Sequence, residues 1–135
     1  MTQPFKVLYI DPSIAGKADP SLVEQQGRAI RLAGGTLVRY EGRDTPALIQ
    51  ALREVDVAMI KGHGFDPAAF AHMGLHGSCK GLVSFGHGFD HLDLSAATAN
   101  GVVVANTASF GTEEVSNHTM MHFLICFVNL LLKIG

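Results

Sequence analysis

Short apolar runs alternate with helix-like stretches along most of the chain, and this alternation restricts the fold more than any other feature. Five runs rich in strand-favouring residues give the expected strands: Phe5–Ile10, Thr36–Tyr40, Val55–Ile60, Leu82–Phe85 and Val102–Ala105. The stretches between them show helix signals such as an apolar face, an early proline or a glycine stop. They give the expected helices: Pro20–Ala33, Thr45–Arg53, Asp66–Met73, Leu94–Ala99 and a last helix from Thr112 onward. Such alternation favours a parallel sheet with helices on both faces.

The chain has 135 residues, of which 47% are apolar and 16% charged, so it can form one hydrophobic core and is not a disordered chain. Five strands fit an α/β, flavodoxin-like, doubly wound parallel sheet. We expect this domain over residues 1–111 and a long apolar connector helix over residues 112–135. Ligands of such sheets bind beyond the carboxyl ends of the strands. The expected site therefore lies at the turns after Ile60, Phe85 and Ala105.

Charge and cysteine usage exclude several classes of protein. The formal net charge of −2 provides no basic surface for nucleic acid. Cys79 and Cys126 are too few for a disulfide framework, and the N-terminal residues are not built like a signal peptide, so we expect reduced thiols and a cytoplasmic protein. His118 and His122 share a helix face, but no third ligand is implied, and we expect no metal site.

A five-residue repeat follows two of the expected strands. Gly62-His63-Gly64-Phe65-Asp66 and Gly86-His87-Gly88-Phe89-Asp90 have the same residues in the same order. A Gly-x-Gly turn can direct bare backbone N–H groups at an anion. The alternative is that both are ordinary tight turns, and for the first turn that alternative stays open. Asp93, a little further on, is expected to cap the short helix that begins at Leu94.

The segment from Ser84 to His118 reads SFGHGFDHLDLSAATANGVVVANTASFGTEEVSNH. Its order of strand, Gly-x-Gly turn, Asp-x-x-Asp segment, strand, Asn-Thr turn and helix start resembles the N-terminal half of the D-isomer-specific 2-hydroxyacid dehydrogenases. The resemblance covers most of the chain and implies a substrate-binding domain. In an intact enzyme of this family, a hydride passes reversibly between nicotinamide and C2 of a 2-oxo acid.

The resemblance also implies roles for particular residues. His87 and Gly88 would offer backbone N–H groups to the substrate carboxylate, although an apolar residue is more common at the position of His87. Lys61 and Gly62 stand where the family has a basic residue followed by serine, and a solvated lysine is an equal alternative for Lys61. Gly111 would approach the substrate. The remaining position, Val115, would pack near the nicotinamide.

Other parts of the family's machinery find no counterpart in residues 1–135. The GxGxxG segment for NAD or NADP, the arginine that orients the substrate and the acid-paired histidine cannot be mapped here. We therefore expect no catalytic residue in this chain, no tight cofactor binding and no activity of the chain alone. We also expect that the chain is truncated at Gly135, with the NAD-binding domain missing or on another chain.

The last expected helix has no charged residue between Val115 and Leu132, and its apolar residues cover all sides. Such a helix is normally buried or in a membrane. Polar residues interrupt the run at Ser116, Asn117, His118, His122 and Asn129, so we expect no membrane span. An exposed apolar helix calls for a partner, and we expect a homo-oligomer formed through it. The alternatives left open are a stand-alone binding or interaction module and one half of a split enzyme.

Overall fold

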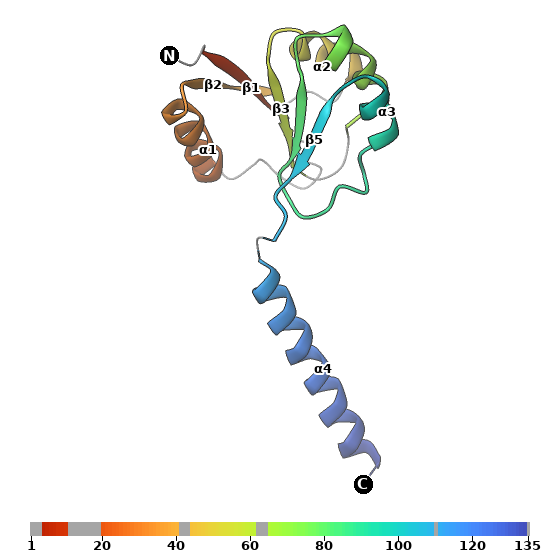
Figure 1. Cartoon of the computed structure of the whole chain (residues 1–135). Helices are drawn as coiled ribbons and strands as arrows, with labels where there is room; N and C mark the ends of the chain where they lie inside the picture. The colour runs from red at the N-terminus through yellow and green to blue at the C-terminus, as the bar shows by residue number, and fades with distance from the viewer. Residues whose placement is uncertain (1–3, 11–19, 41–43, 62–64, 110, 135) are drawn as a thin grey trace.

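The computed structural model describes residues 4–10, 20–40, 44–61, 65–109 and 111–134. Its centre is one five-stranded parallel sheet with the strand order β2-β1-β3-β4-β5, shown in Figure 1. The strands are β1 (Phe5–Ile10), β2 (Gly35–Tyr40), β3 (Val57–Ile60), β4 (Gly81–Ser84) and β5 (Val103–Asn106). The order reverses once beside β1, which is the flavodoxin-like doubly wound arrangement. The predicted fold class is therefore confirmed.

The helices follow the predicted positions with small changes at their ends. They are α1 (Pro20–Leu32), α2 (Thr45–Leu52), α3 (Leu94–Ala99) and α4 (Thr112–Ile134), with two short 3₁₀ helices, η1 (Pro67–His72) and η2 (Gly74–His76). The short helix expected over Asp66–Met73 is present as η1, and it is of the 3₁₀ type. The amide of Met73 donates to the carbonyl of Phe70, three residues earlier, and the left-handed φ of Gly74 follows at once.

Aspartate side chains fix the starts of three helices. The side chain of Asp44 accepts from Ala47 N at the start of α2, and that of Asp93 accepts from Ala96 N at the start of α3. The predicted cap at Asp93 is therefore confirmed. At η1, Asp66 accepts from Ala68 N at 2.9 Å and from the Thr45 hydroxyl at 2.6 Å. Both hydrogen bonds favour the charged form and hold the pKa of the Asp66 carboxyl below its ordinary value.

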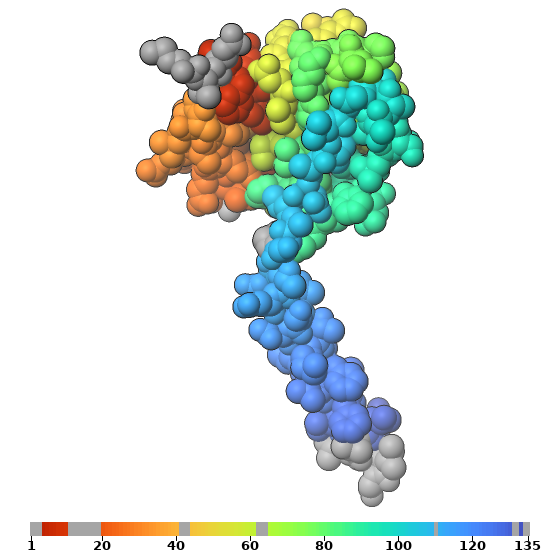
Figure 2. Space-filling view, viewed as in Figure 1, coloured from red at the N-terminus to blue at the C-terminus, as the bar shows by residue number. Residues whose placement is uncertain are grey.

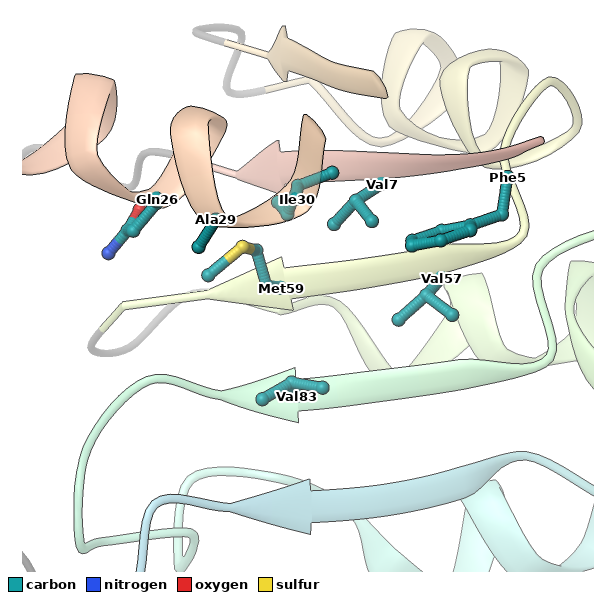
Figure 3. A pocket seen from close by; sticks show the side chains of 8 residues that line it. All are labelled: Phe5, Val7, Gln26, Ala29, Ile30, Val57, Met59 and Val83. Atoms are coloured by element: carbon teal, nitrogen blue, oxygen red, sulfur yellow. The ribbon is translucent and has the colours of Figure 1, made fainter. Parts of the chain in front are cut away.

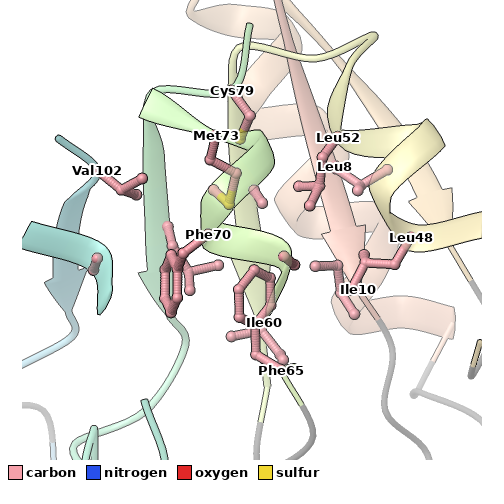
Figure 4. Packing of buried hydrophobic residues seen from close by; sticks show 14 of the residues in the cluster. Leu8, Ile10, Leu48, Leu52, Ile60, Phe65, Phe70, Met73, Cys79 and Val102 are labelled. Carbon is pink, nitrogen blue, oxygen red and sulfur yellow. The ribbon is translucent and has the colours of Figure 1, made fainter. Parts of the chain in front are cut away.

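The two faces of the sheet are covered to different extents. On one face, α2, η1 and α3 enclose a large apolar cluster that includes Leu8, Leu52, Ile60, Phe70 and Met73, seen in Figure 4. On the other face lies a smaller cluster of Val7, Tyr9, Val23 and Met59 beneath α1, with Val7 and Met59 drawn in Figure 3. The sheet is therefore well buried on the α2 side and only partly covered on the α1 side.

Helix α4 projects away from the sheet, beyond the carboxyl end of β5 (Figures 1 and 2). The side chains described along it, from Thr112 to Leu130 and at Lys133, are all exposed. The sequence favoured a buried environment for so apolar a helix, and within this single chain the helix does not have one. Within the described part of the chain, no helix has the length and hydropathy needed to cross a membrane.

Candidate functional site

The carboxyl ends of β3, β4 and β5 meet at one edge of the sheet. Their register places Ile60 beside Ser84 and Ser84 beside Asn106. The residues that follow these three strands include Lys61, the Gly86–Phe89 turn and the connection into α4. The predicted site is therefore gathered at one edge, as the parallel sheet requires. The prediction for Gly62 falls outside the described residues.

The Gly86-His87-Gly88 turn is held from beneath by three hydrogen bonds. The Asn106 side-chain amide donates to the carbonyl of His87 at 2.7 Å, and the Ser84 hydroxyl donates to that of Gly88 at 2.9 Å. The backbone amide of Thr107 donates to the carbonyl of Gly86 at 3.2 Å. Three consecutive carbonyls of the turn are thus engaged by the ends of β4 and β5. Ser84 is buried, so its hydroxyl needs a hydrogen-bond partner, and the carbonyl of Gly88 provides one.

The outer side of the turn is open. His87 and Gly88 are exposed, and a side chain built on Gly86 would meet nothing within 4 Å. No described residue accepts a hydrogen bond from the backbone N–H of Gly88. The carbonyls of the turn are thus engaged, while the Gly88 N–H can donate to a ligand. A backbone donor of this kind suits an anion.

The start of α4 lies beside this turn. A Cβ placed on Gly111 would stand 3.8 Å from His87 Cε1 and 3.8 Å from Glu114 Oε2. The structure thus brings together two predicted residues, His87 and Gly111, and Glu114 of the first turn of α4 also lies next to Gly111. As expected, α4 begins at Thr112, whose hydroxyl donates to the carbonyl of Ser109 at 3.1 Å.

Lys61 and Val115 occupy the margins of the site. Lys61 is exposed and directly follows Ile60, whose carbonyl accepts from Phe85 N at 2.7 Å at the base of the second turn. No described hydrogen bond or ion pair joins Lys61 to His87. Val115 is 63% exposed on the first turn of α4, where it lines a shallow hollow with Glu114 and His118. The site is therefore an open edge made of turns and one helix start.

The two copies of the five-residue repeat have different environments. Phe65 of the first copy is buried in the main core and packs against Phe70 with a ring separation of 4.9 Å. Phe89 of the second copy is 43% exposed. Asp66 caps η1, whereas Asp90 lies in an exposed turn. Phe65 and Asp66 of the first copy thus have structural roles, whereas the second copy contains the Gly86-His87-Gly88 turn of the candidate site.

The histidines of α4 are close to each other. The rings of His118 and His122 meet edge to face with their centroids 4.6 Å apart. Across the described residues, no three His, Cys, Asp or Glu side chains gather closely enough to hold a metal ion. The prediction of no metal site stays a prediction.

Sequence reasoning did not select Ser84 and Asn106, which fix the turn. Each is the last residue of its strand, β4 and β5. That position is the one available signal, because polar residues at strand carboxyl ends lie at the ligand edge of a parallel sheet.

Comparison with known proteins identifies the family of the chain. Residues 13–126 match the family described as D-isomer specific 2-hydroxyacid dehydrogenase, catalytic domain. A search of curated protein sequences found no match. Among solved structures, the chain is similar to a D-2-hydroxyisocaproate dehydrogenase, with a TM-score of 0.66 and 14% identity, covering 88% of this chain and 34% of that one.

Two further solved structures are also similar in fold to this chain. The NAD+-bound 3-phosphoglycerate dehydrogenase of Entamoeba histolytica gives a TM-score of 0.65 at 20% identity, covering 76% of this chain and 32% of that one. The citrate complex of the NADPH-dependent glyoxylate/hydroxypyruvate reductase of Sinorhizobium meliloti gives 0.62 at 26% identity, covering 86% and 32%. The chain spans about a third of the length of each of these proteins. By its family match over residues 13–126, the chain belongs to the D-isomer specific 2-hydroxyacid dehydrogenases and corresponds to part of their catalytic domain.

Proposed function

We propose that this chain is the substrate-binding domain of an NAD(P)-dependent D-2-hydroxyacid dehydrogenase, with the domain over residues 1–111 and a connector helix over 112–135. Its ligand would be a small 2-oxo or 2-hydroxy acid. The observation that supports this most directly is the fixed Gly86-His87-Gly88 turn, whose carbonyls are engaged and whose Gly88 amide has no acceptor among the described residues. The solved structures named above include enzymes of 2-hydroxy and 2-oxo acids, which supports the same class of ligand.

Several residues of the site would contribute to the binding of such an acid. The turn would hold the carboxylate through backbone N–H groups at His87 and Gly88. The imidazole of His87 lies near Gly111 and Glu114, so it would border the same ligand from the helix side. Lys61, and Gly62 by the family resemblance, would complete the site from the end of β3. Each of these groups binds or orients the acid, and none is proposed to transfer a proton.

The cofactor would contact this chain at one residue, Val115. NAD or NADP supplies the hydride acceptor or donor for C2 of the acid when it is bound in the intact enzyme. Val115 fits a nicotinamide contact because it is an exposed apolar side chain on the helix turn next to Gly111. One apolar side chain is a small fraction of a dinucleotide site, so we propose no tight cofactor binding and no hydride transfer by this chain alone.

A titration of the ¹⁵N-labelled chain with sodium glyoxylate, followed by NMR, tests the proposed ligand. We expect saturable shifts of the amides of Gly88 and Phe89 and of residues around Gly111. Gly88→Ala, which adds a methyl group at the residue of the proposed backbone donor, 3.9 Å from Asp90 Oδ2, should weaken them. Gly27→Ala on α1 is the control, because its added methyl lies away from the turn and first meets the flexible side chain of Arg31. Shifts that are absent, or that also occur at distant sites with sodium acetate, would contradict the proposal. Steady NADH oxidation by the pure chain would contradict its inactivity.

We propose, in addition, that the chain forms a homo-oligomer through α4. The exposed apolar side chains along this helix support self-association. The two described cysteines are free thiols, which supports a cytoplasmic location. A stand-alone interaction module that oligomerises in this way, and a split enzyme with its NAD-binding domain on another chain, are the alternatives. A measured mass above that of one chain, without glyoxylate binding, would favour the interaction module.

A further inference from the structure

The turn from α3 into β5 contains an asparagine that can react with the chain's own backbone. Of the asparagines in this sequence, only Asn100 precedes a glycine, Gly101. The backbone nitrogen of the next residue can attack an asparagine side-chain amide, and glycine hinders this attack least because it has no Cβ. Asparagine is for this reason one of the thermolabile residues. The Asn100-Gly101 pair is therefore the place where covalent change of an asparagine is chemically easiest in this chain.

In the folded domain, the two reacting groups are held apart. The Gly101 amide donates to the carbonyl of Thr98 at 3.0 Å. The Asn100 side-chain amide donates to the carbonyl of Ala96 at 2.8 Å. Asn100 has a ψ of 4°, which places the Gly101 nitrogen beside the backbone nitrogen of Asn100 and away from its side chain. Attack requires the Gly101 nitrogen to lose its proton and the backbone to rotate, so it requires the end of α3 to open.

The backbone of Asn100 also packs closely against η2. Its carbonyl accepts from the amide of Leu75 at 2.8 Å, and a Cβ on Gly74 would collide with the same oxygen. Gly101 has a left-handed φ of 68°, and a Cβ there would stand 2.9 Å from Leu75 Cγ. The turn therefore has no room for an additional backbone atom while η2 and α3 stay in contact.

Helix α3 is short, and one side chain fixes its start. The helix spans only Leu94–Ala99, and the Asp93 side chain caps it by accepting from the amide of Ala96 at 2.8 Å. Short helices have few internal hydrogen bonds and open more readily than the strands of a core. Because Ala96 and Thr98 provide the carbonyls that hold the reacting groups, opening of α3 releases both groups at once.

We propose that Asn100 is a site of self-modification, which the fold restricts to the moments when the end of α3 is open. In the open form, the Gly101 nitrogen bonds to Asn100 Cγ and the bond from Cγ to Nδ2 breaks. Ammonia leaves with the proton of the Gly101 nitrogen, and a cyclic imide remains. Water then opens the ring. Cleavage at Cγ gives aspartate, whereas cleavage at the backbone carbonyl carbon gives isoaspartate. No oxidant or reductant takes part.

Neither product fits the turn that Asn100 makes. An ionised aspartate only accepts hydrogen bonds, so it cannot donate to the carbonyl of Ala96 as the amide does. Isoaspartate lengthens the backbone by a methylene group at the position where Gly74 and Leu75 leave no room. The modification therefore loosens the contact between α3 and η2, and this change persists after the helix closes again.

Peptide mapping by mass spectrometry after incubation at mildly alkaline pH provides the test, because it separates asparagine, aspartate and isoaspartate. A synthetic peptide of residues 95–105 is the unfolded reference. We expect Asn100 to convert in the folded chain at least about 10-fold more slowly than in this peptide. Asp93→Ala, which removes the cap of α3, should speed conversion in the chain about 5-fold. Asp44→Ala is the matched control because it removes the same kind of cap from α2, and it should leave the rate unchanged.

Hydrogen exchange in the unaltered chain provides a second readout that needs no variant. The ratio of the conversion rates in chain and peptide should match the open fraction measured at the Gly101 amide, and this amide should exchange faster than those of β1 and β3. Asn100→Asp, which has the structure of one product, should speed exchange of the Leu75 amide about 5-fold.

Several results would overturn the proposal. One is an Asn100 that stays intact in both the unaltered chain and Asp93→Ala, and another is conversion as fast in the chain as in the peptide. Equal acceleration by Asp93→Ala and Asp44→Ala would show that conversion follows global unfolding and does not depend on the end of α3. Unchanged exchange at Leu75 in Asn100→Asp would overturn the stated consequence for η2.

Discussion

The side-chain amide of Asn106 donates a 2.7 Å hydrogen bond to the backbone carbonyl of His87, which ties the end of β5 to the turn after β4. The two residues are 19 positions apart in the chain and meet because β4 and β5 are adjacent and in register. The bond engages a carbonyl of the turn, while the backbone N–H of Gly88 has no acceptor among the described residues. The geometry of the candidate site therefore depends on a residue that would not itself touch the ligand.

Replacing Asn106 by leucine keeps the side-chain size and removes the donor. We expect the free energy of unfolding to fall by about 1–2 kcal/mol, since the carbonyl of His87 loses its partner. The glyoxylate-induced NMR shifts at Gly88 should weaken several-fold as the turn loosens. Asn100→Leu is the matched control, because its amide makes a similar 2.8 Å bond to the carbonyl of Ala96, away from the site. If both variants lose stability and glyoxylate binding equally, Asn106 does not position the turn.

Gly74 and Gly86 should respond very differently to alanine. Gly74 has a φ of 56°, and a methyl there would collide with the backbone carbonyl of Asn100. Strain and collision together should lower the free energy of unfolding by about 2–5 kcal/mol. Gly86→Ala should change it by less than about 0.5 kcal/mol, because the space around Gly86 is open. Chemical denaturation followed by circular dichroism measures both, and equal losses would contradict the description of these turns.

The two thiols should differ in reactivity and in their effect on stability. Cys79 is fully buried, and burial raises the pKa of its thiol from 9.0 to about 11, whereas Cys126 is exposed. Ellman's reagent at neutral pH should label one thiol in the native chain and two in denaturant. Native labelling of both would show that the site of Cys79 opens readily.

The same pKa shift gives stability a pH dependence with a definite sign. Between pH 9 and 11 the unfolded chain has lost the Cys79 proton while the folded chain keeps it. The folded state then binds more protons, so the free energy of unfolding should fall as the pH rises through this range. Cys79→Ala should remove that part of the slope, and Cys126→Ser should leave it in place. An unchanged slope in Cys79→Ala would assign the effect to other groups.

The sequence allowed the fold to be predicted because its signals are local. Alternating runs, the aspartate caps and the glycine stops act over a few residues, and they indicated the strand and helix order that the structure has. The 3₁₀ type of η1 is a detail that the sequence did not indicate, since the pattern over Asp66–Met73 predicted only a short helix. Asp66 caps the start of η1, and the left-handed Gly74 follows shortly after its end.

The candidate site was predicted in part for the same reason. His87, Gly88 and Gly111 are turn residues at strand ends, and their position at one edge follows from a parallel sheet. Ser84 and Asn106 were missed because their roles depend on which strands are neighbours and on the register between them. The two copies of the GHGFD repeat are identical in sequence, so nothing local could tell that Phe65 enters the core while Phe89 stays exposed.

The sequence by itself determined the elements, their order, the family and the apolar character of the last helix, since each is read from neighbouring residues. Only the tertiary structure decided where that helix goes and which part of the sheet is left bare. Helix α4 projects away from the sheet beyond the carboxyl end of β5, and Val103 on β5 is left 71% exposed. Burial is a property of the assembled layers, so a residue pattern can require a partner surface without saying which one it is.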